Sequence, residues 1–584
     1  MKHLSILVLS LLSFSILHAQ DNSDGKKFTF HGSVQSEILA FPQEDNKIGT
    51  GTYEDDFMTN TYLELSVHNK YFQAGTRFEY LDHPLPGFET DFKGWGLPYF
   101  YVKGNYKWAE LTLGDFYDQF GSGLIFRAYE QRNLGIDNSL RGGRLTLKPY
   151  KGISIKMLGG QQRYYWQYRN LKSDLPWTYG GDIELNIDQW FKKMDESGNR
   201  LTLGFSGISN HAGKEDDLIA MRPNPNNPTL QDSYRLLLPK NVGAFDVRAN
   251  YQNNNYNFLV EYAWKSNDPS SANNYTYGKG KTLLLSGSYS QKGMSVLVQA
   301  KRSEDMSFRS HRMIDKGSTA CYINYLPAFS MQHTYALPSL YPYATQMVPG
   351  EWAFQGEVSY LFKRRTALGG KYGTKVKVNF SHIRGIDQSF DETHKNEMGY
   401  DAPKSKFFSM GPDTYYQDIN VQLEKKITRD FKLNFMYANQ NYNQLVVEGH
   451  GSKAIKSNIF VLEGKYTFSN KVTLRGEAQY LHTRQDQKDW YYGLLELSVL
   501  PHLMFTISDM YNANVPTYTN DGAVDDSKGT NKVHYLMGSV TYSHKAHRLQ
   551  VNYGKTRSGF NCSGGVCRYV PASKGLSATY SFNF

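Results

Sequence analysis

Apolar and polar residues alternate along short segments over most of this chain. The last nine residues, Leu576–Phe584, show the pattern: each even position is apolar or aromatic and each odd position is small and polar. A period of two is typical of a β-strand with one apolar face and one polar face. We therefore predict a strand that ends at the aromatic residue Phe584.

Similar segments recur from residue 28 onward, and short connections alternate with long ones. The predicted short connections include 69–70, 107, 150–152, 253–255, 291–293, 469–470, 501–502 and 544–546. The predicted long gaps are 41–58, 82–98, 115–141, 161–177, 209–242, 266–280, 304–350, 384–413, 441–456, 512–531 and 557–575. This alternation is expected of a membrane barrel with short periplasmic turns and long extracellular loops. We predict an all-β fold, a single large antiparallel transmembrane β-barrel of about 24 strands, with about 22 to 26 allowed.

Charged residues within the predicted strands fall on one face. In the segment 471–482, Val472 and Leu474 share a face, whereas Arg475 and Glu477 share the other. A charge that faces lipid near the middle of the bilayer costs about 2–4 kcal/mol. We therefore expect these charges to face the lumen.

The amino-terminal residues have the pattern of a signal peptide. Lys2 and His3 precede an apolar run from Leu4 to Leu17, and Ala19 follows it. We divide the chain into a signal peptide at 1–19 and a barrel at 20–584, and we expect the outer membrane of a Gram-negative bacterium as its location.

The composition is compatible with this assignment. Hydrophobic residues make up 40% of the chain, the mean hydropathy is −0.57, and there are 44 Tyr and 33 Phe. So polar a chain does not fit a helical membrane protein, whereas in a barrel only alternate residues touch lipid. A secreted, Tyr-rich β protein such as a glycan-binding sandwich would have a similar composition.

The net charge of +10 is spread along the chain. The absence of a basic run with interleaved aromatic residues argues against nucleic acid as a partner. Outer-membrane lipid and lipopolysaccharide are the expected partners of a barrel surface, but the net charge itself is better explained by a mixed, solvated surface than by attraction to these lipids.

Three cysteines occur in the sequence, and two of them are close together. Cys562 and Cys567 flank Gly564 and Gly565, so we predict a disulfide that closes a small loop in an oxidising compartment. A zinc site would need two further ligands, which this segment lacks. Cys321 has no predicted partner or role.

A barrel of about 24 strands has a wide lumen, which would leak unless loops, side chains or another protein filled it. Only residues 20–27 precede the first predicted strand, which leaves no room for the plug domain of a TonB-dependent transporter. The segment Gly114–Arg144 is rich in apolar residues for a loop and also carries many charges. We predict that residues 115–141 fold into the lumen; a structured extracellular flap is the alternative. The candidate lumen residues are Asp115, Phe116, Phe120, Arg127, Glu130, Arg132, Asp137 and Arg141. Residues 304–350 are a second candidate, which would cap the barrel or present its tyrosines to a partner.

The same segment contains the strings GDFYDQFGSG, RAYEQR and GIDNSLRGGR between Gly114 and Arg144. In these it resembles a family of Bacteroidota outer-membrane proteins whose function is not assigned. The resemblance implies a barrel and an outer-membrane location, and it carries no catalytic residue. Resemblance to other outer-membrane barrels also implies that Phe584 is the insertion signal read by the assembly machinery.

The sequence offers little chemistry beyond this. His382, His482 and His544 lie outside any recognisable nucleophile motif, so no enzyme activity and no catalytic residue is predicted. The acidic segments 215–217 and 521–526 do not follow the spacing of a known calcium loop. No metal site and no cofactor is predicted.

Two functions remain. We expect a structural or accessory barrel that binds other envelope proteins and whose lumen is closed by its own loops. The alternative is a porin-like diffusion channel for small polar solutes such as saccharides or peptides.

Overall fold

A computed structural model of the chain describes residues 28–53, 55–166, 174–215, 217–224, 226–390, 394, 397–520 and 522–584. The predicted signal peptide at 1–19 lies outside the described residues.

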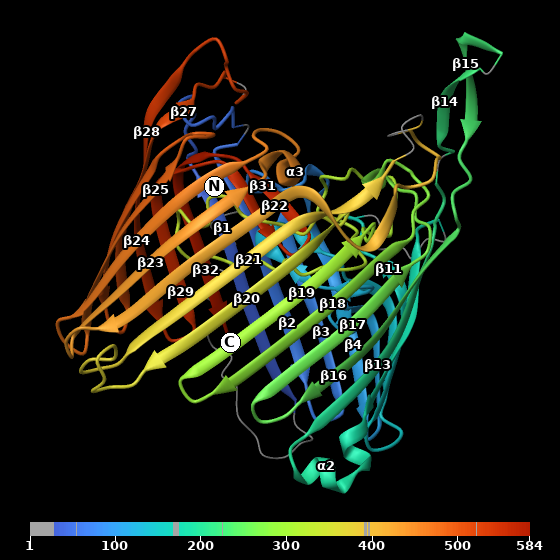
Figure 1. The fold of residues 1–584 in the computed structure, drawn as a ribbon, viewed down its shortest axis with the longest axis horizontal. Coiled ribbons are helices and arrows are strands. Elements are labelled where there is room, and N and C mark those ends of the chain that lie inside the picture. The colour runs from blue at the N-terminus through green and yellow to red at the C-terminus, as the bar shows by residue number, and fades with distance from the viewer. Residues whose placement is uncertain are drawn as a thin grey trace.

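Within the described residues, 24 strands form one sheet that closes on itself, as predicted (Figure 1). Each neighbouring pair of these strands is antiparallel. The first twelve are β1 (Thr29–Ala40), β2 (Phe57–His68), β3 (Phe72–Leu81), β4 (Gly94–Tyr106), β5 (Ala109–Phe116), β10 (Leu140–Leu147), β11 (Ile153–Gln162), β12 (Trp177–Asn186), β13 (Arg200–His211), β16 (Asn241–Gln252), β17 (Tyr256–Lys265) and β18 (Gly280–Gln291). The others are β19 (Met294–Glu304), β20 (Gly350–Phe362), β21 (Thr374–Ser389), β22 (Lys404–Lys426), β23 (Phe431–Tyr442), β24 (Ile455–Thr467), β25 (Val472–Thr483), β26 (Trp490–Val499), β27 (Leu503–Pro516), β28 (Thr530–His544), β29 (His547–Thr556) and β32 (Ser573–Asn583).

Short strands and helices lie in the connections. The strands are β6 (Asp118–Gln119), β7 (Arg127–Ala128), β8 (Glu130–Gln131), β9 (Ile136–Asp137), β14 (Ile219–Asn224), β15 (Asn227–Arg235), β30 (Gly559–Ser563) and β31 (Val566–Val570). The helices are η2 (Thr90–Phe92), η3 (Arg132–Leu134), η5 (Ile187–Trp190), α2 (Lys192–Glu196), η6 (Ser271–Asn273) and α3 (Gln444–Glu448).

The closing strand is the one predicted at the carboxy-terminal end. β32 pairs with β1 from Ser33↔Asn583 to Ala40↔Leu576, and this pairing closes the barrel. Beyond β32, Phe584 and Gly32 exchange two backbone hydrogen bonds of 2.9 Å. A Cβ atom on Gly32 would overlap the Phe584 ring, so the glycine makes room for this side chain at the seam.

The two faces of the strands differ as the alternating pattern predicts. On β16, Phe245 and Val247 are exposed on the outside, whereas Asp246 and Arg248 are buried on the inside. A closed barrel with an apolar outer surface satisfies every strand's backbone within the sheet, which is what a membrane demands. The fold is therefore that of a transmembrane barrel. Among the described residues, no helix is long and apolar enough to cross a bilayer.

Several predicted gaps contain strands where loops were expected, including β6 to β9 within 115–141 and β30 and β31 within 557–575. Two further examples are the gaps at 384–413 and 209–242. The gap at 384–413 is shorter than predicted, because β21 continues to Ser389 and β22 begins at Lys404. Three register shifts after Ile383 interrupt the alternation of apolar and polar residues. The ends of these two strands therefore could not be recognised from the sequence. The gap at 209–242 contains the hairpin β14–β15, which projects beyond the barrel rim at the upper right of Figure 1.

Candidate functional site: the loop-filled lumen

Two connections at the long-loop end of the barrel contribute to a single buried core. We name residues 117–139, between β5 and β10, the motif loop, and residues 305–349, between β19 and β20, the long loop. In the motif loop, Phe120, Leu124 and Phe126 are fully buried. In the long loop, Ile323 and Leu326 are fully buried as well. Loops on a protein surface do not bury their apolar side chains in this way.

The partners of these side chains are inward-facing residues of the barrel wall. They belong to the same hydrophobic cluster as the two loops. The wall residues include Leu158, Ile208, Val242, Ala244, Ala263, Leu284, Ala353, Ile383, Met436, Ala438, Ile459 and Leu481. These positions come from strands between β11 and β25. The loops therefore lie inside the lumen and connect its walls through one apolar core.

Asp115 and Arg141 join the two ends of the motif loop. Arg141 donates from Nε to Oδ1 of Asp115 over 2.9 Å and from Nη2 to Oδ2 over 2.8 Å. The backbone N–H of Phe100 donates a further bond of 2.8 Å to Oδ2. This bidentate ion pair is buried. It holds β5 and β10 together at the points where the chain leaves the barrel wall and returns to it.

Asp137 attaches the motif loop to the wall. It accepts hydrogen bonds from Arg77 of β3, from Arg163 at 2.6 Å and from the Tyr117 hydroxyl at 2.9 Å. Glu79 lies on the other side of both arginines, 2.8 Å from each. Burial by itself would raise the pKa of Asp137, but the guanidinium groups of Arg77 and Arg163 outweigh it and hold that pKa well below its usual range.

The remaining charges of the motif loop are also paired. Glu130 lies 2.7 Å from Arg132 and 3.1 Å from Arg77. Arg132 also reaches Glu64 on β2. Arg127 packs between two rings, with its guanidinium carbon 4.3 Å from the Tyr129 centroid and 4.1 Å from that of Tyr325. The Tyr325 contact links the motif loop to the long loop.

The glycines of the GDFYDQFGSG string have a physical role where the loop touches the wall. Gly121 has φ of +50°, and a Cβ atom there would clash with Glu261 and Arg248. The next N–H, of Ser122, donates to both carboxylate oxygens of Glu261 at 3.1 and 3.2 Å. A side chain at position 121 would prevent this close approach.

Buried pairs also anchor the long loop. Lys301 of β19 lies 3.0 Å from Glu351 of β20, and both side chains are fully buried. Tyr343 of the long loop donates to Glu351, and Lys301 donates to Thr345 Oγ1 at 2.8 Å. Two strands along the wall from β20, His333 Nε2 lies 2.6 Å from Asp418 on β22. In this loop, Tyr322, Tyr341 and Tyr343 are buried rather than presented at the surface, and Tyr325 and Tyr335 are partly buried.

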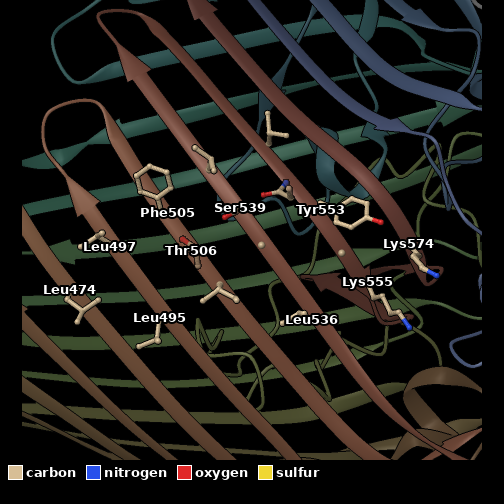
Figure 2. Close-up of a pocket in the computed structure, with 16 residues that line it drawn as sticks. Leu474, Leu495, Leu497, Phe505, Thr506, Leu536, Ser539, Tyr553, Lys555 and Lys574 are labelled. Carbon is tan, nitrogen blue, oxygen red and sulfur yellow. The ribbon is translucent and has the colours of Figure 1, made fainter.

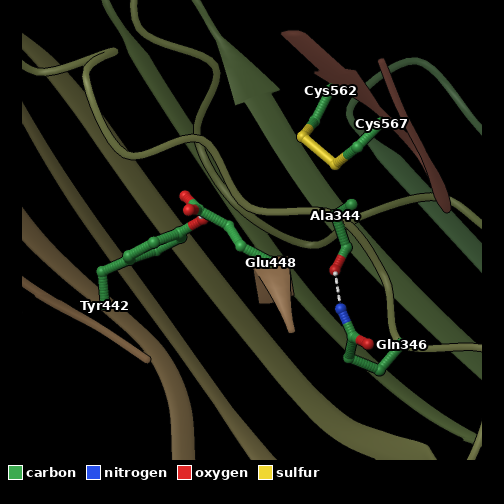
Figure 3. Close-up of a disulfide and its surroundings, with 6 residues drawn as sticks. All are labelled: Ala344, Gln346, Tyr442, Glu448, Cys562 and Cys567. Atoms are coloured by element: carbon green, nitrogen blue, oxygen red, sulfur yellow. Dashed lines mark hydrogen bonds between the residues drawn. A yellow bond between two sulfur atoms is a disulfide. The ribbon is translucent and has the colours of Figure 1, made fainter. Parts of the chain in front are cut away.

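A third connection enters beside the long loop. Cys562 of β30 and Cys567 of β31 form a disulfide, with their Cα atoms 4.1 Å apart. The N–H of Thr345 donates to Gly564 O at 2.9 Å in the tip of this hairpin. Figure 3 shows the disulfide next to Ala344 and Gln346 of the long loop. The free cysteine, Cys321, is buried in the long loop, and its burial raises the pKa of the thiol to about 12.

Toward the short turns, the inner wall becomes polar and partly exposed. On β20, Glu351 and Ala353 are fully buried, whereas Glu357 is partly exposed and pairs with Lys377 at 2.8 Å. Similarly, Arg475 reaches Glu463 at 3.2 Å on the partly exposed inner face of β25 and β24. The loops therefore fill the half of the lumen near the long-loop end, and the other half is lined by polar side chains.

The candidate lumen residues come together in one unit with the wall. Phe116 and Phe120 lie in the apolar core, and the six charged candidates make the contacts described above. Sequence reasoning missed the residues on or next to the wall that hold the two loops in place: Arg77, Glu79, Arg163, Glu261, Lys301 and Glu351. The alternation of charges marks each of these as inward-facing, but nothing in it tells which loop residue each will meet. Among the described residues, no group of three or more His, Cys, Asp or Glu side chains is arranged to hold a metal ion.

The burial of His311 makes the packing of the long loop depend on pH. Its ring stacks on Tyr164 with centroids 4.0 Å apart, and Nε2 is buried without a hydrogen-bond partner among the described residues. Burial lowers the pKa of His311 from 6.5 to about 4. His311 therefore binds a proton more readily when the loop is unpacked than when it is packed. The stabilisation of the packed loop by neutral His311 is complete above pH 6.5 and is lost as the pH falls toward 4.

We therefore expect amide hydrogen exchange in residues 305–320 to speed up severalfold between about pH 7.5 and about pH 5, after correction for intrinsic rates. In a His311→Phe variant, which keeps the ring stack without a titratable group, this extra pH dependence should disappear. An equal acceleration in both proteins would show that His311 is not its source.

The chain aligns with solved barrel structures over most of its length. The siderophore receptor PirA from Pseudomonas aeruginosa is 10% identical, with a TM-score of 0.38, and the alignment covers 95% of this chain and 80% of that one. The siderophore receptor PirA from Acinetobacter baumannii is 8% identical, with a TM-score of 0.37 and the same coverage. The copper transporter OprC is 8% identical, with a TM-score of 0.39, and the alignment covers 97% of this chain and 82% of that one.

Comparison with curated sequences finds no match. A family model, described as a family of unknown function, matches residues 1–584. The match spans the whole barrel together with the motif loop. The chain belongs to this family of unknown function, DUF6029.

Proposed function

We propose that this protein is an accessory barrel of the outer membrane, which binds other envelope proteins and keeps its lumen closed with its own loops. The observation that carries the proposal is the apolar core that joins the motif loop and the long loop to the wall. A diffusion channel needs a continuous aqueous path, and close-packed apolar side chains in the lumen oppose one. The porin-like alternative is therefore the weaker of the two.

The surface that would meet a partner is the hairpin β14–β15. It projects beyond the rim in Figure 1, and Ile219, Met221 and Leu230 on it are exposed. Leu237, two residues after the hairpin, is 83% exposed. Apolar side chains gathered on a projecting element are typical of a protein interaction site, and a hairpin with free edges also offers backbone groups for strand pairing.

Photocrosslinking in intact envelopes tests this function. A photoreactive amino acid at Met221 should trap one protein in stoichiometric amount, and the same probe at the lipid-facing Leu113 should not. A probe at Leu237, which lies outside the excised residues, should also trap this protein, and that crosslink should be absent when the hairpin is removed by joining Ala220 to Tyr234, which are paired across its base. Recovery of the monomer alone from the Met221 variant would contradict the proposal.

A further inference from the structure

A groove runs along the outer wall of the barrel over β25 to β29 and β32 (Figure 2). Its volume is about 800 Å³. Outward-facing apolar side chains line it, among them Leu495, Leu497, Phe505, Leu536 and Tyr553. These positions face the hydrocarbon region of the membrane, so an apolar group fits the groove.

Glycine makes part of the floor of this groove. A Cβ atom at Gly538 would meet no atom within 4 Å. An outward-facing glycine in the middle of a strand weakens the strand and leaves a hollow between the larger side chains around it. Because φ at Gly538 is not in the left-handed region, the fold itself does not require glycine there.

Two lysines lie at one end of the groove. Figure 2 shows Lys555 and Lys574 next to each other, at the end away from Leu497 and Phe505. Lys555 is near the end of β29 and Lys574 near the start of β32, so both lie at the long-loop end of the barrel. Both reach the same carboxylate, Asp45, at 2.8 and 3.6 Å, and their side chains remain 27% and 28% exposed. One carboxylate balances one of the two positive charges.

We propose that this groove binds a phosphorylated lipid of the outer leaflet, of the lipid A type, with an acyl chain along the apolar channel and a phosphate on Lys555 and Lys574. In a barrel with short periplasmic turns, the long-loop end faces the outside, which places the lysines at the level of the outer-leaflet headgroups. Ammonium groups at that level attract anionic lipid headgroups, and lysine binds phosphate as a point charge. This inference does not depend on the proposed function.

The proposal can be tested by native mass spectrometry of the full-length barrel in detergent, exchanged with lipid A that carries two phosphates. We expect one lipid A to be retained per barrel, and the dephosphorylated lipid to be retained much less. Replacing both lysines by glutamine should lower the affinity about thirtyfold. Equal retention of the two lipids would overturn the role of the lysines.

Two glycine variants separate the groove from general lipid contact. Gly538→Leu fills the groove and should abolish retention, whereas Gly104→Leu should not. Gly104 faces outward on β4, and a Cβ atom there also meets no atom within 4 Å. Equal loss in both variants, or a dimer formed through the groove in place of bound lipid, would overturn the proposal.

Asp45→Asn distinguishes charge from structure. It breaks both ion pairs with the lysines and leaves the lysines themselves in place. Because it frees the second positive charge, lipid A should be held at least as tightly as by the unchanged protein. A loss of binding as large as that of the double lysine variant would show that the ion pairs act only on the structure of the rim.

Discussion

Excision of the core of the motif loop is expected to convert a barrel that does not conduct ions into one that does. Asp118 and Ala128 are paired across β6 and β7, so a two-glycine turn can replace residues 119–127. The change removes Phe120, Leu124, Ile125 and Phe126, all fully buried in the lumen. In planar bilayers, we expect the conductance of the variant to exceed that of the intact barrel by on the order of tenfold or more, because water enters the emptied volume.

A second excision and a matched control make the result specific. The N–H of Met306 donates to Met347 O at 3.1 Å, so residues 307–346 can be removed in the same way, and the double variant should conduct most. Removing residues 221–233 from the hairpin β14–β15, which lies outside the lumen, should leave the barrel silent. Correctly folded barrels that stay silent after both lumenal excisions would contradict the account.

Breaking the pair Lys301–Glu351 should have the largest effect of any single substitution on stability. Lys301→Met leaves the Glu351 carboxylate buried without its counter-ion. Loss of one partner from a buried ion pair costs about 3–5 kcal/mol, so the free energy of unfolding in lipid vesicles should fall by about that amount, as measured by urea titration.

The double variant Lys301→Met, Glu351→Gln is the control for this prediction. It removes both charges and leaves no unpaired one, so it should recover most of the lost stability. The amide oxygen introduced by Glu351→Gln can still accept the hydrogen bond that Tyr343 donates. A cost below about 0.5 kcal/mol for Lys301→Met alone would show that water reaches the pair and that the long loop does not seal this part of the lumen.

Much of the barrel can be predicted from the sequence because its signal is local. The alternation in Leu576–Phe584 is enough to identify β32, and its pairing with the first strand follows from closure. The pattern fails where the backbone departs from regular pleating. The start of β4 could not be recognised from the sequence because it contains Gly94, Gly96 and Pro98. Gly94 and Gly96 have positive φ, and the pairing with β3 has a register shift there.

The lumen is less predictable because its contacts join residues far apart in the chain. The mixture of Phe120 with charged residues in the motif loop is unusual for a surface loop and indicated a buried position. It does not indicate that Arg163 would meet Asp137, or that Ser122 would bind Glu261, 139 residues away. Those pairings depend on which strands lie opposite one another in the closed barrel, and alternation along one strand carries no information about this.

Cysteine labelling in intact cells tests the closed lumen most directly. Cys321 is first replaced by Ser, and single cysteines are then introduced at Ile125, which is 1% exposed, and at Leu237, which is 83% exposed. A membrane-impermeant maleimide added outside should label position 237 rapidly and position 125 at less than about a hundredth of that rate, since labelling there requires the loop to leave the lumen. Equal labelling at the two positions would show that the motif loop is an extracellular flap, and would contradict the account.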